Sequence, residues 1–269
     1  MKTATKKDGH IHTAFCPHGT KDAISDYIEQ AILLGFTEIS FTEHAPLPAG
    51  FIDSTPTKDS SIALEDLPHY VHMVEQAKDY YKNKIKINIG LEVDYIEGFE
   101  QEIKSFLNEW GPKLDDSILS VHFLKNNMNY DCVDYSPELF ANMISQYGSA
   151  EAIYERYFET IKKSVFADLG PFKPKRIGHI TLVHKFQKKF PVSKDYRSTI
   201  IQLLKDIKQQ QLELDYNGAG LYKPFCQESY PPSWVALEAK KQQISLVYGS
   251  DAHQAKDIGQ GFDMLLGNR

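Results

Sequence analysis

Histidine dominates the residues of this chain that could carry out chemistry. Near the N-terminus stands Asp8-Gly9-His10-Ile11-His12, and His18 follows six residues after His12. In an extended strand, residues i and i+2 point to the same face, so His10 and His12 would aim their imidazoles together. Neutral imidazole is the commonest metal ligand in proteins. The pair therefore indicates a metal site, although by itself it could also be a surface cluster or the remnant of an affinity tag.

More imidazoles and carboxylates follow later segments that have the pattern of strands. These candidates lie at or just beyond the expected strand ends and are His44, Glu92, His122, His179, Asp251 and His253. They are too many for one ion, and imidazoles with two carboxylates and no thiolate suit Zn²⁺, Mn²⁺ or Fe²⁺. Two ions about 3.5–4 Å apart can activate a shared water and clamp both oxygens of a displacement. The pattern favours a multinuclear site that hydrolyses a phosphate ester, with one carboxylate bridging two ions.

The other histidines have a weaker case. His69 and His72 stand three apart on an expected helix and should lie on the surface. His184 could reach the mouth of the site but is a minor candidate. Cys16 stands between His12 and His18, yet no neighbouring base or orienting partner supports a role as ligand or nucleophile.

The elements that must position these residues alternate between strand and helix. Strands are expected at 6–10, 37–42, 84–92, 116–122, 176–179, 212–217 and 244–249. Helices are expected at 21–34, 64–81, 98–109, 137–146, 149–165, 194–208 and 232–241, with a closing helical segment at 262–266. A polar, proline-bearing loop at 45–61 is long enough to be an active-site lid. The alternation predicts a parallel sheet, and since no glycine-rich phosphate loop follows a strand, a closed barrel fits better than a dinucleotide-binding sheet.

Composition narrows the setting of this barrel. The chain has 269 residues, 25% charged and 42% hydrophobic, and we expect one domain spanning 1–269. A net charge of −6 disfavours a broad nucleic-acid or membrane surface. No apolar run is long enough to span a bilayer and no signal peptide is evident. Three widely spaced cysteines predict a reduced cytoplasmic protein without disulfides. The oligomeric state stays open.

Taken together and in order, these motifs resemble those of the PHP (polymerase and histidinol phosphatase) family of metal-dependent phosphoesterases. The resemblance runs from Asp8-Gly9-His10-Ile11-His12 to Ser250-Asp251-Ala252-His253. It implies a distorted (β/α)7 barrel of TIM type, with the active site at the C-terminal strand ends and three divalent ions (Zn, Mn or Fe). The stretches Phe41-Thr42-Glu43-His44-Ala45-Pro46, 90–95 and 120–123 look most like the branch of the family that acts on L-histidinol phosphate.

The resemblance also implies a role for each site residue. His10, His12, Glu92 and Asp251 would hold the first ion, Glu92, His122 and His179 the second, and His18, His44 and His253 the third. All nine positions carry the expected residue type. A hydroxide bridging the first two ions would attack phosphorus. Asp251 would take a proton from the water, and His253 or a bound water would protonate the leaving oxygen.

Substrate contacts are predicted from residue type alone. Arg156 and Arg197 are candidates for the phosphate, because a guanidinium binds it in bidentate fashion. Either Asp94 or Glu43 could receive the ammonium group. Four aromatic side chains could stack on an imidazole ring, namely Phe51, Tyr95, Phe123 and Tyr222.

The favoured interpretation is a phosphomonoesterase that takes a small phosphate ester, L-histidinol phosphate, in histidine biosynthesis. The alternative within the family is a phosphoesterase acting on nucleotides or on nucleic-acid 3′ ends. Amide or lactone hydrolysis by a related metal barrel is a third possibility, but those relatives usually carry a bridging lysine, and none stands at a strand end here. A metal-storing or regulatory binding module is the non-enzymatic alternative.

Overall fold

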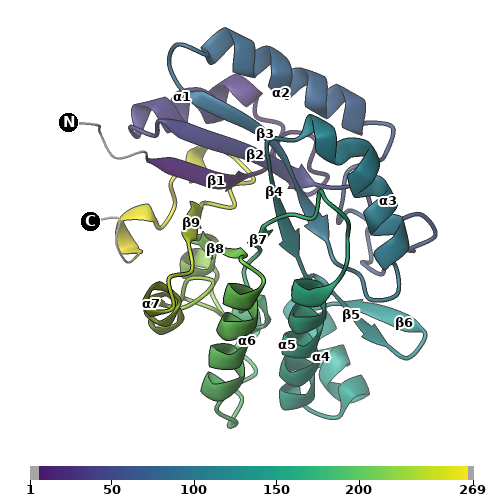
Figure 1. Ribbon diagram of the computed structural model, residues 1–269. Helices are drawn as coiled ribbons and strands as arrows, with labels where there is room; N and C mark the ends of the chain where they lie inside the picture. Colours follow the sequence, from purple (N-terminus) through teal and green to yellow (C-terminus); the bar gives the residue numbers. More distant parts are fainter. Residues whose placement is uncertain (1–5, 266–269) are drawn as a thin grey trace.

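The computed structural model describes residues 6–265, and in this part of the chain seven parallel strands curl into a barrel (Figure 1). Their order in the sheet is β1-β2-β3-β4-β7-β8-β9. The bounds are β1 Lys7–Ile11, β2 Glu38–His44, β3 Lys86–Asp94, β4 Asp116–Ser120, β7 Arg176–Ile177, β8 Glu213–Asn217 and β9 Leu246–Gly249. Strand order follows chain order, as expected when each strand is followed by a helical crossover.

The ring of strands closes where β1 meets the segment after β9. Ile11 forms a parallel bridge with Ala252. The amide of His12 donates to the carbonyl of Ala252 at 3.0 Å, and the amide of Asp251 donates to the carbonyl of His10 at 2.7 Å. Closure at the C-terminal strand ends therefore brings the first and last ligand motifs together. The predicted distorted (β/α)7 barrel is confirmed.

The helices surround the strands, with α1 and α2 over β1–β3 on one side and α5, α6 and α7 on the other (Figure 1). Their bounds are α1 Ile24–Leu33, α2 Leu67–Tyr81, α3 Glu100–Trp110, α4 Pro137–Tyr147, α5 Ala150–Phe166, α6 Arg197–Gln209 and α7 Ser233–Lys241. Each begins and ends within three residues of its predicted range. Gly35 follows α1 at φ +75°, a left-handed conformation that suits glycine and ends the helix.

Two predicted elements need correction, and one hairpin was missed. The strand expected at 176–179 is only Arg176–Ile177, and the closing segment is a 3₁₀ turn, Phe262–Met264, while Leu266 lies outside the described residues. A hairpin of β5 (Phe123–Asn126) and β6 (Asn129–Cys132) was not predicted. Its polar residues give little alternation of apolar and polar side chains, which is the pattern that identifies a strand.

The strands of the barrel are buried on both faces, as in other parallel sheets. In β3, all residues from Ile87 to Asp94 are buried. The pairing of β2 with β3 sets His44 beside Glu92, so two predicted ligands lie next to each other on neighbouring strands. At the opposite end of the barrel, the buried Arg176 pairs with Asp116 at 2.6 Å, so this arginine lies away from the site.

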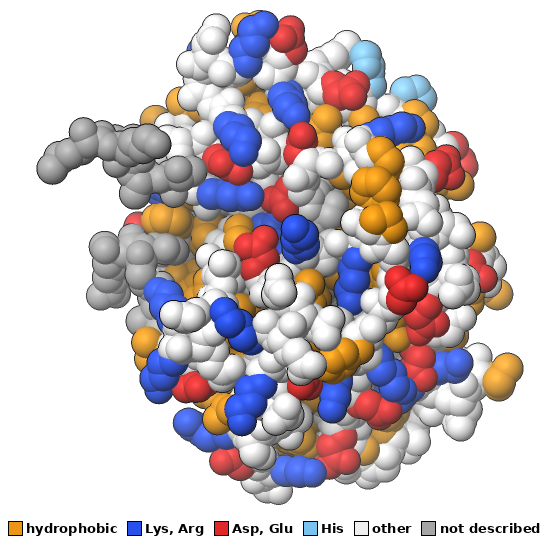
Figure 2. Space-filling view, in the orientation of Figure 1, with side chains coloured by type: hydrophobic (Ala, Val, Ile, Leu, Met, Phe, Trp, Pro, Cys, Tyr) orange, Lys and Arg blue, Asp and Glu red, His pale blue; other side chains and the backbone are white. Residues whose placement is uncertain are grey.

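On the face of the molecule seen in Figure 2, lysine and arginine side chains are interspersed with aspartate and glutamate. This mixture fits the slightly acidic net charge. Within residues 6–265, no helix has both the length and the hydropathy needed to cross a membrane.

Candidate metal centre

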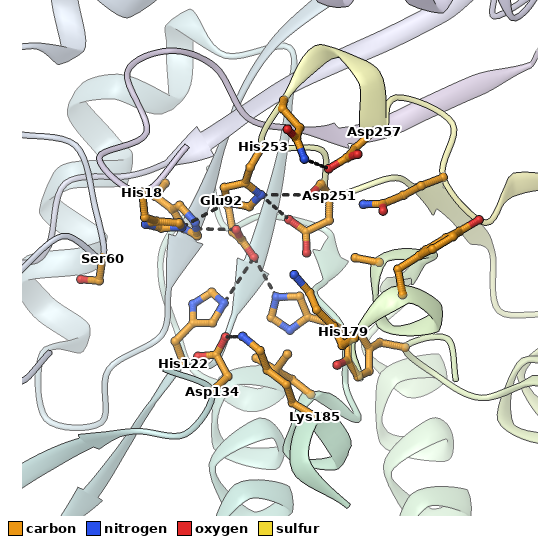
Figure 3. Close-up of a pocket in the computed structure, with 18 of the residues that line it drawn as sticks. His18, Ser60, Glu92, His122, Asp134, His179, Lys185, Asp251, His253 and Asp257 are labelled. Atoms are coloured by element: carbon orange, nitrogen blue, oxygen red, sulfur yellow. Dashed lines mark hydrogen bonds and ion pairs between the residues drawn. The ribbon is translucent and has the colours of Figure 1, made fainter. Parts of the chain in front are cut away.

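The C-terminal ends of the strands surround a pocket of about 1060 Å³ (Figure 3). Seven of the nine predicted ligands line it directly: His18, His44, Glu92, His122, His179, Asp251 and His253. The other two, His10 and His12, are both fully buried. The barrel thus brings all nine predicted positions to one mouth.

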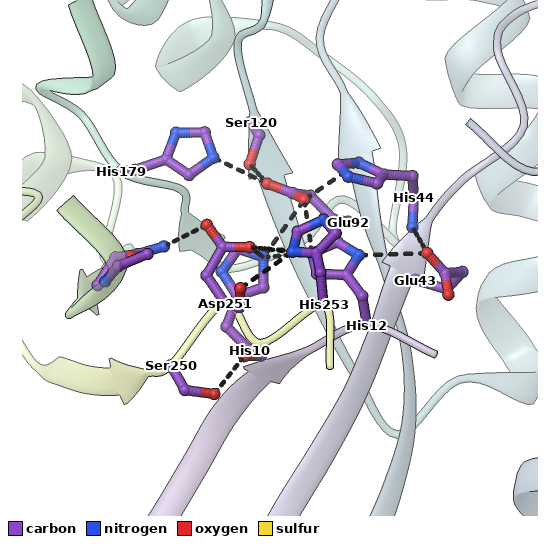
Figure 4. A network of polar contacts seen from close by, with 12 residues as sticks. His10, His12, Glu43, His44, Glu92, Ser120, His179, Ser250, Asp251 and His253 are labelled. Atoms are coloured by element: carbon purple, nitrogen blue, oxygen red, sulfur yellow. Dashed lines mark hydrogen bonds and ion pairs between the residues drawn. The ribbon is translucent and has the colours of Figure 1, made fainter. Parts of the chain in front are cut away.

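The deepest group joins the end of β1 to Glu92 of β3 (Figure 4). The Nε2 atoms of His10 and His12 are 3.3 Å apart. They lie 3.3 and 3.5 Å from Oε2 of Glu92. Asp251 adds Oδ1 at 3.2 Å from Nε2 of His12. Two imidazole nitrogens and two carboxylates therefore converge on a single point.

The hydrogen bonds at the far side of each ring fix what these nitrogens can do. Nδ1 of His10 lies 2.9 Å from Asp215, and Nδ1 of His12 lies 3.2 Å from Glu43. In the neutral rings those protons sit on Nδ1, so each Nε2 presents a lone pair to the other and to Glu92. Such a set of facing acceptors lacks a donor, and a divalent cation between them would satisfy all of them. These residues fit a metal ion.

A second group forms on the other oxygen of Glu92. Nε2 of His179 lies 2.9 Å from Oε1 and Nε2 of His122 lies 3.7 Å from it. The hydroxyl of Ser120 donates to the same oxygen at 2.6 Å. Oε2 of Glu92 thus faces the pair His10 and His12 and also lies 3.2 Å from Nδ1 of His44, while Oε1 faces the pair His122 and His179. A carboxylate that faces a different histidine pair with each oxygen has the geometry of a bridging ligand.

A third group lies nearer to solvent. The Nε2 atoms of His18 and His253 are 3.1 Å apart, and each ring presents its Nδ1 to a backbone carbonyl. His44 stands beside them, with its ring centroid 5.1 Å from that of His18 and 5.9 Å from that of His253. Here, too, lone pairs face each other, and the fit to a cation is repeated.

Neighbouring carboxylates raise the pKa values of the two deepest histidines, His10 and His12. Burial would lower the pKa of His10, but the carboxylates of Glu92, Asp215 and Asp251 raise it well above the ordinary value. Burial is likewise overcome at His12, where hydrogen bonds to Asp251 and Glu43 raise the pKa to about 9. The carboxylates therefore favour positive charge at these two positions, and a bound cation would supply that charge in place of the protons.

The upper histidines shift the other way. Burial and the neighbouring His12 hold the pKa values of both His44 and His253 well below their ordinary value. These rings are therefore neutral near pH 7, and a neutral imidazole is the form that binds metal.

Three buried carboxylates orient the deep histidines, and two of them were predicted for another role. Asp94 lies 2.7 Å from Nδ1 of His122. Glu43, fully buried, contacts His12 and accepts hydrogen bonds from the amide and hydroxyl of Thr13 at 2.9 and 2.6 Å. Neither carboxylate is free to receive a substrate ammonium group, so that expectation is replaced by a role in holding ligands. Asp215 does the same for His10 and was not among the candidates selected from the sequence.

The two arginines predicted for the phosphate lie elsewhere. Arg156 binds Glu97 at 2.7 Å and Glu159 at 3.2 Å and does not line the pocket. The guanidinium of Arg197 lies 4.7 Å from the ring centre of Trp234, also outside the pocket. Two of these partners, Glu97 and Trp234, come from distant parts of the sequence.

Other side chains form the wall around the predicted ligands. Nζ of Lys185 lies 2.8 Å from Asp134, and both residues line the pocket together with Tyr135. Of the aromatic candidates, Tyr222 lines the pocket. Sequence reasoning missed Lys185 and Asp134, because neither stands at a strand end.

The remaining aromatic candidates pack together away from the ligands. Phe51 lies with its ring centre 5.0 Å from those of both Phe123 and Tyr130. The hydroxyl of Tyr95 donates to Glu100 at 2.7 Å. None of Phe51, Tyr95 and Phe123 lines the pocket.

Cys16 and His184 were the weaker candidates from the sequence, and the structure shows where both lie. Sγ of Cys16 lies within 4.8 Å of ligand atoms of His12, His44 and His253, so it could join a metal site. Burial raises the pKa of this thiol far above its ordinary value, which keeps it protonated without a metal. His184 binds Glu228 at 2.6 Å.

His69 and His72 lie exposed on α2, as predicted.

The sequence matches known proteins over nearly its whole length. The family model described as the PHP domain matches residues 8–219. A histidinol-phosphatase of Bacillus subtilis is 49% identical over 263 residues, which cover 97% of this chain and 98% of that protein.

Solved structures share the fold as well. One from Listeria monocytogenes, described as a candidate histidinol phosphatase, has a TM-score of 0.92 and 41% identity, with 96% of this chain and 99% of that chain covered. The histidinol phosphate phosphatase of Lactococcus lactis, solved with zinc, L-histidinol and phosphate, has a TM-score of 0.68 and 22% identity. The match covers 93% of this chain and 87% of that chain, and at this level of identity it shows only that the two proteins share a fold.

Proposed function

The chain belongs to the PHP domain family, and on this premise we propose that it is a metal-dependent phosphomonoesterase that hydrolyses L-histidinol phosphate in histidine biosynthesis. The observation that carries the proposal is the convergence of imidazole lone pairs and carboxylates on Glu92, which fits cations. The substrate is supported by the name of the Bacillus relative, which has nearly the same length and is 49% identical. The products would be L-histidinol and phosphate.

We propose three ions, and the donor types suit Zn, Mn or Fe. His10, His12, Glu92 and Asp251 would hold the first. Glu92, His122 and His179 would hold the second, and His18, His44 and His253 the third. Bound there, divalent ions would supply an activated water and neutralise the phosphoryl oxygens.

The protein side chains would set the geometry and move protons. Glu92 would bridge and fix the spacing of two ions, because its two oxygens face different histidine pairs. Asp251 would take a proton from the attacking water, and its second oxygen is held by the amide of Asn217 at 3.1 Å. His253 uses Nδ1 on a backbone carbonyl and turns Nε2 to His18, so it has no N–H left for the leaving oxygen. Its role is therefore that of a ligand.

Lys185 replaces the arginines as the cation that would contact the phosphate. Its side chain is 22% exposed and lines the same pocket as His179 and Asp251. Burial would lower its pKa, but Asp134 raises it, so the ammonium group stays charged. A fixed positive charge at the pocket wall is what a phosphate ester requires.

The wider setting we propose is a single barrel domain in a reduced, cytoplasmic compartment. The three cysteines are free and buried, which supports the absence of a disulfide framework. The alternative substrate class, nucleotides or nucleic-acid 3′ ends, has the size of the pocket in its favour, since 1060 Å³ exceeds the needs of a small ester.

The test is phosphate release by metal-reconstituted protein. L-histidinol phosphate should be compared with p-nitrophenyl phosphate, nucleoside monophosphates and a short single-stranded DNA. We expect kcat/KM for L-histidinol phosphate to exceed the others by about 10³-fold or more, because a site that pairs polar groups of its substrate rejects analogues lacking them. A flat profile, or a preference for DNA, would discard the named substrate while leaving the metal centre in place.

A further inference from the structure

The loop at 45–61 forms part of the pocket wall and touches the third group of ligands. Thr55, Asp59 and Ser60 line the pocket together with His18, and Figure 3 shows Ser60 on the same side of the pocket as His18. The carbonyl of Asp59 accepts a hydrogen bond from Nδ1 of His18 at 2.8 Å. This bond places the lone pair of Nε2 toward His253. The loop therefore decides how His18 faces the centre.

A single carboxylate organises the turn that carries this carbonyl. Oδ1 of Asp53 accepts from the amide of Thr55 at 2.8 Å. Its Oδ2 accepts from the amide and hydroxyl of Ser60 at 3.2 and 2.7 Å. These bonds tie both ends of the segment 54–60, and Asp59 lies next to one of them. The position of the Asp59 carbonyl thus depends on Asp53.

No comparable loop contact holds the deep histidines in the described residues 6–265. His10, His12 and His122 each present Nδ1 to a buried carboxylate on a strand, at 2.9, 3.2 and 2.7 Å. Those carboxylates belong to β8, β2 and β3. A change in the 53–60 turn would reach His18 without moving any of these pairs.

We propose that Asp53 is a positioning residue for the third ion: by fixing the 53–60 turn it sets the affinity of the His18, His44 and His253 site and leaves the other two sites unchanged. This inference rests on the proposed three-ion centre. Asp53 itself does not line the pocket and would act through the Asp59 carbonyl and His18.

The test is metal stoichiometry, which is independent of any phosphatase assay. Chelator-stripped protein is dialysed to equilibrium against a series of free Mn²⁺ concentrations, and ions per chain are counted by mass spectrometry. We expect wild type to bind three ions. Asp53→Ala should retain two, with the third requiring roughly 10- to 100-fold more free Mn²⁺, the usual cost of losing a residue that orients a ligand.

Matched variants separate this role from a general loss of structure. Ile52→Ala changes an exposed neighbour, 75% accessible, and should behave as wild type. Ser60→Ala removes only one of the bonds to Asp53 and should shift the third ion less than Asp53→Ala does. His18→Ala defines the two-ion state for reference.

Two results would overturn the inference alone: Asp53→Ala and Ser60→Ala both matching wild type, or all three ions weakening equally. If wild type itself binds fewer than three ions at saturating Mn²⁺, the proposed centre fails and the inference fails with it. Retention of two ions with selective loss of the third supports it.

Discussion

The metal centre has two halves that are built differently. The barrel half comprises His10, His12 and His122 with Glu92, which we propose bridges two ions, and its histidines are oriented by buried carboxylates. The loop half comprises His18 and His253, whose rings are oriented by backbone carbonyls. His10 and His12 are fully buried, whereas the side chain of His253 is 28% exposed and His18 is exposed.

This difference has a physical consequence for the ions. A carboxylate on the far nitrogen of a histidine fixes the tautomer and makes the ring a stronger ligand. A carbonyl fixes the tautomer but carries no net charge, and water can compete at an exposed ring. The barrel half should therefore hold its ions as part of the folded structure, and the loop half should exchange its ion more readily.

The largest effect is expected where both halves meet, at Glu92. The variant Glu92→Gln removes the negative charge that faces both histidine pairs, while the amide keeps the shape. We expect kcat to fall by about 10³-fold, since the ions supply several kcal/mol of transition-state stabilisation. Steady-state hydrolysis, with circular dichroism as the check on folding, measures it. Unchanged turnover in a folded variant would sink the bridging role.

A smaller effect is expected from the support of the barrel half. Asp215→Asn keeps the hydrogen bond to His10 but removes the charge behind it. The affinity of the protein for the first ion should drop by roughly 10- to 100-fold. Metal titration of stripped protein measures this change. Asp206→Asn, at a buried carboxylate on the outer helix α6, is the matched control and should bind like wild type. Equal metal affinities of Asp215→Asn and Asp206→Asn would contradict the proposed difference between the two halves.

The smallest effect is expected outside both halves, at the Asp134–Lys185 pair in the pocket wall. Burial would raise the pKa of Asp134, but the ammonium of Lys185 lowers it below the ordinary value. In the unfolded chain, an aspartate carboxyl has a pKa of about 4. The ion pair therefore stabilises the fold above that pH, and this contribution is lost as the pH falls below it. Asp134→Asn should cost about 1–2 kcal/mol near pH 7, because both side chains are about one-fifth exposed.

Denaturant unfolding of metal-free protein at about pH 7 and about pH 3 measures this difference. The gap between wild type and Asp134→Asn should narrow in acid. Asp79→Asn, at an exposed surface pair, provides the baseline and should show no gap at either pH. A gap of constant size would mean that the carboxyl group of Asp134 contributes by packing rather than by charge.

Sequence patterns were sufficient for the framework and for the identity of the nine candidate ligands. Each expected strand lies within two residues of its observed bounds, because alternating strands and helices leave a strong periodic signal. The candidates could be selected because parallel strands all deliver their C-terminal ends to one mouth. The hairpin β5–β6 was not predicted, since its polar residues lack that periodicity.

Tertiary structure decided how the other polar residues are used. The sequence around Glu43 does not indicate that this residue binds His12, and the sequence around Arg156 does not indicate that it binds Glu97. These partners meet only when separate strands and helices pack. The same holds for Asp53, which lies in a loop, and for Lys185, which lies in the short 3₁₀ helix Leu182–Phe186, because neither segment is long enough to show a periodic pattern. By itself the sequence determined the fold and the chemistry of the mouth, through periodicity and residue type. Which carboxylates and cations face the ions, and which face one another, was decided by long-range packing.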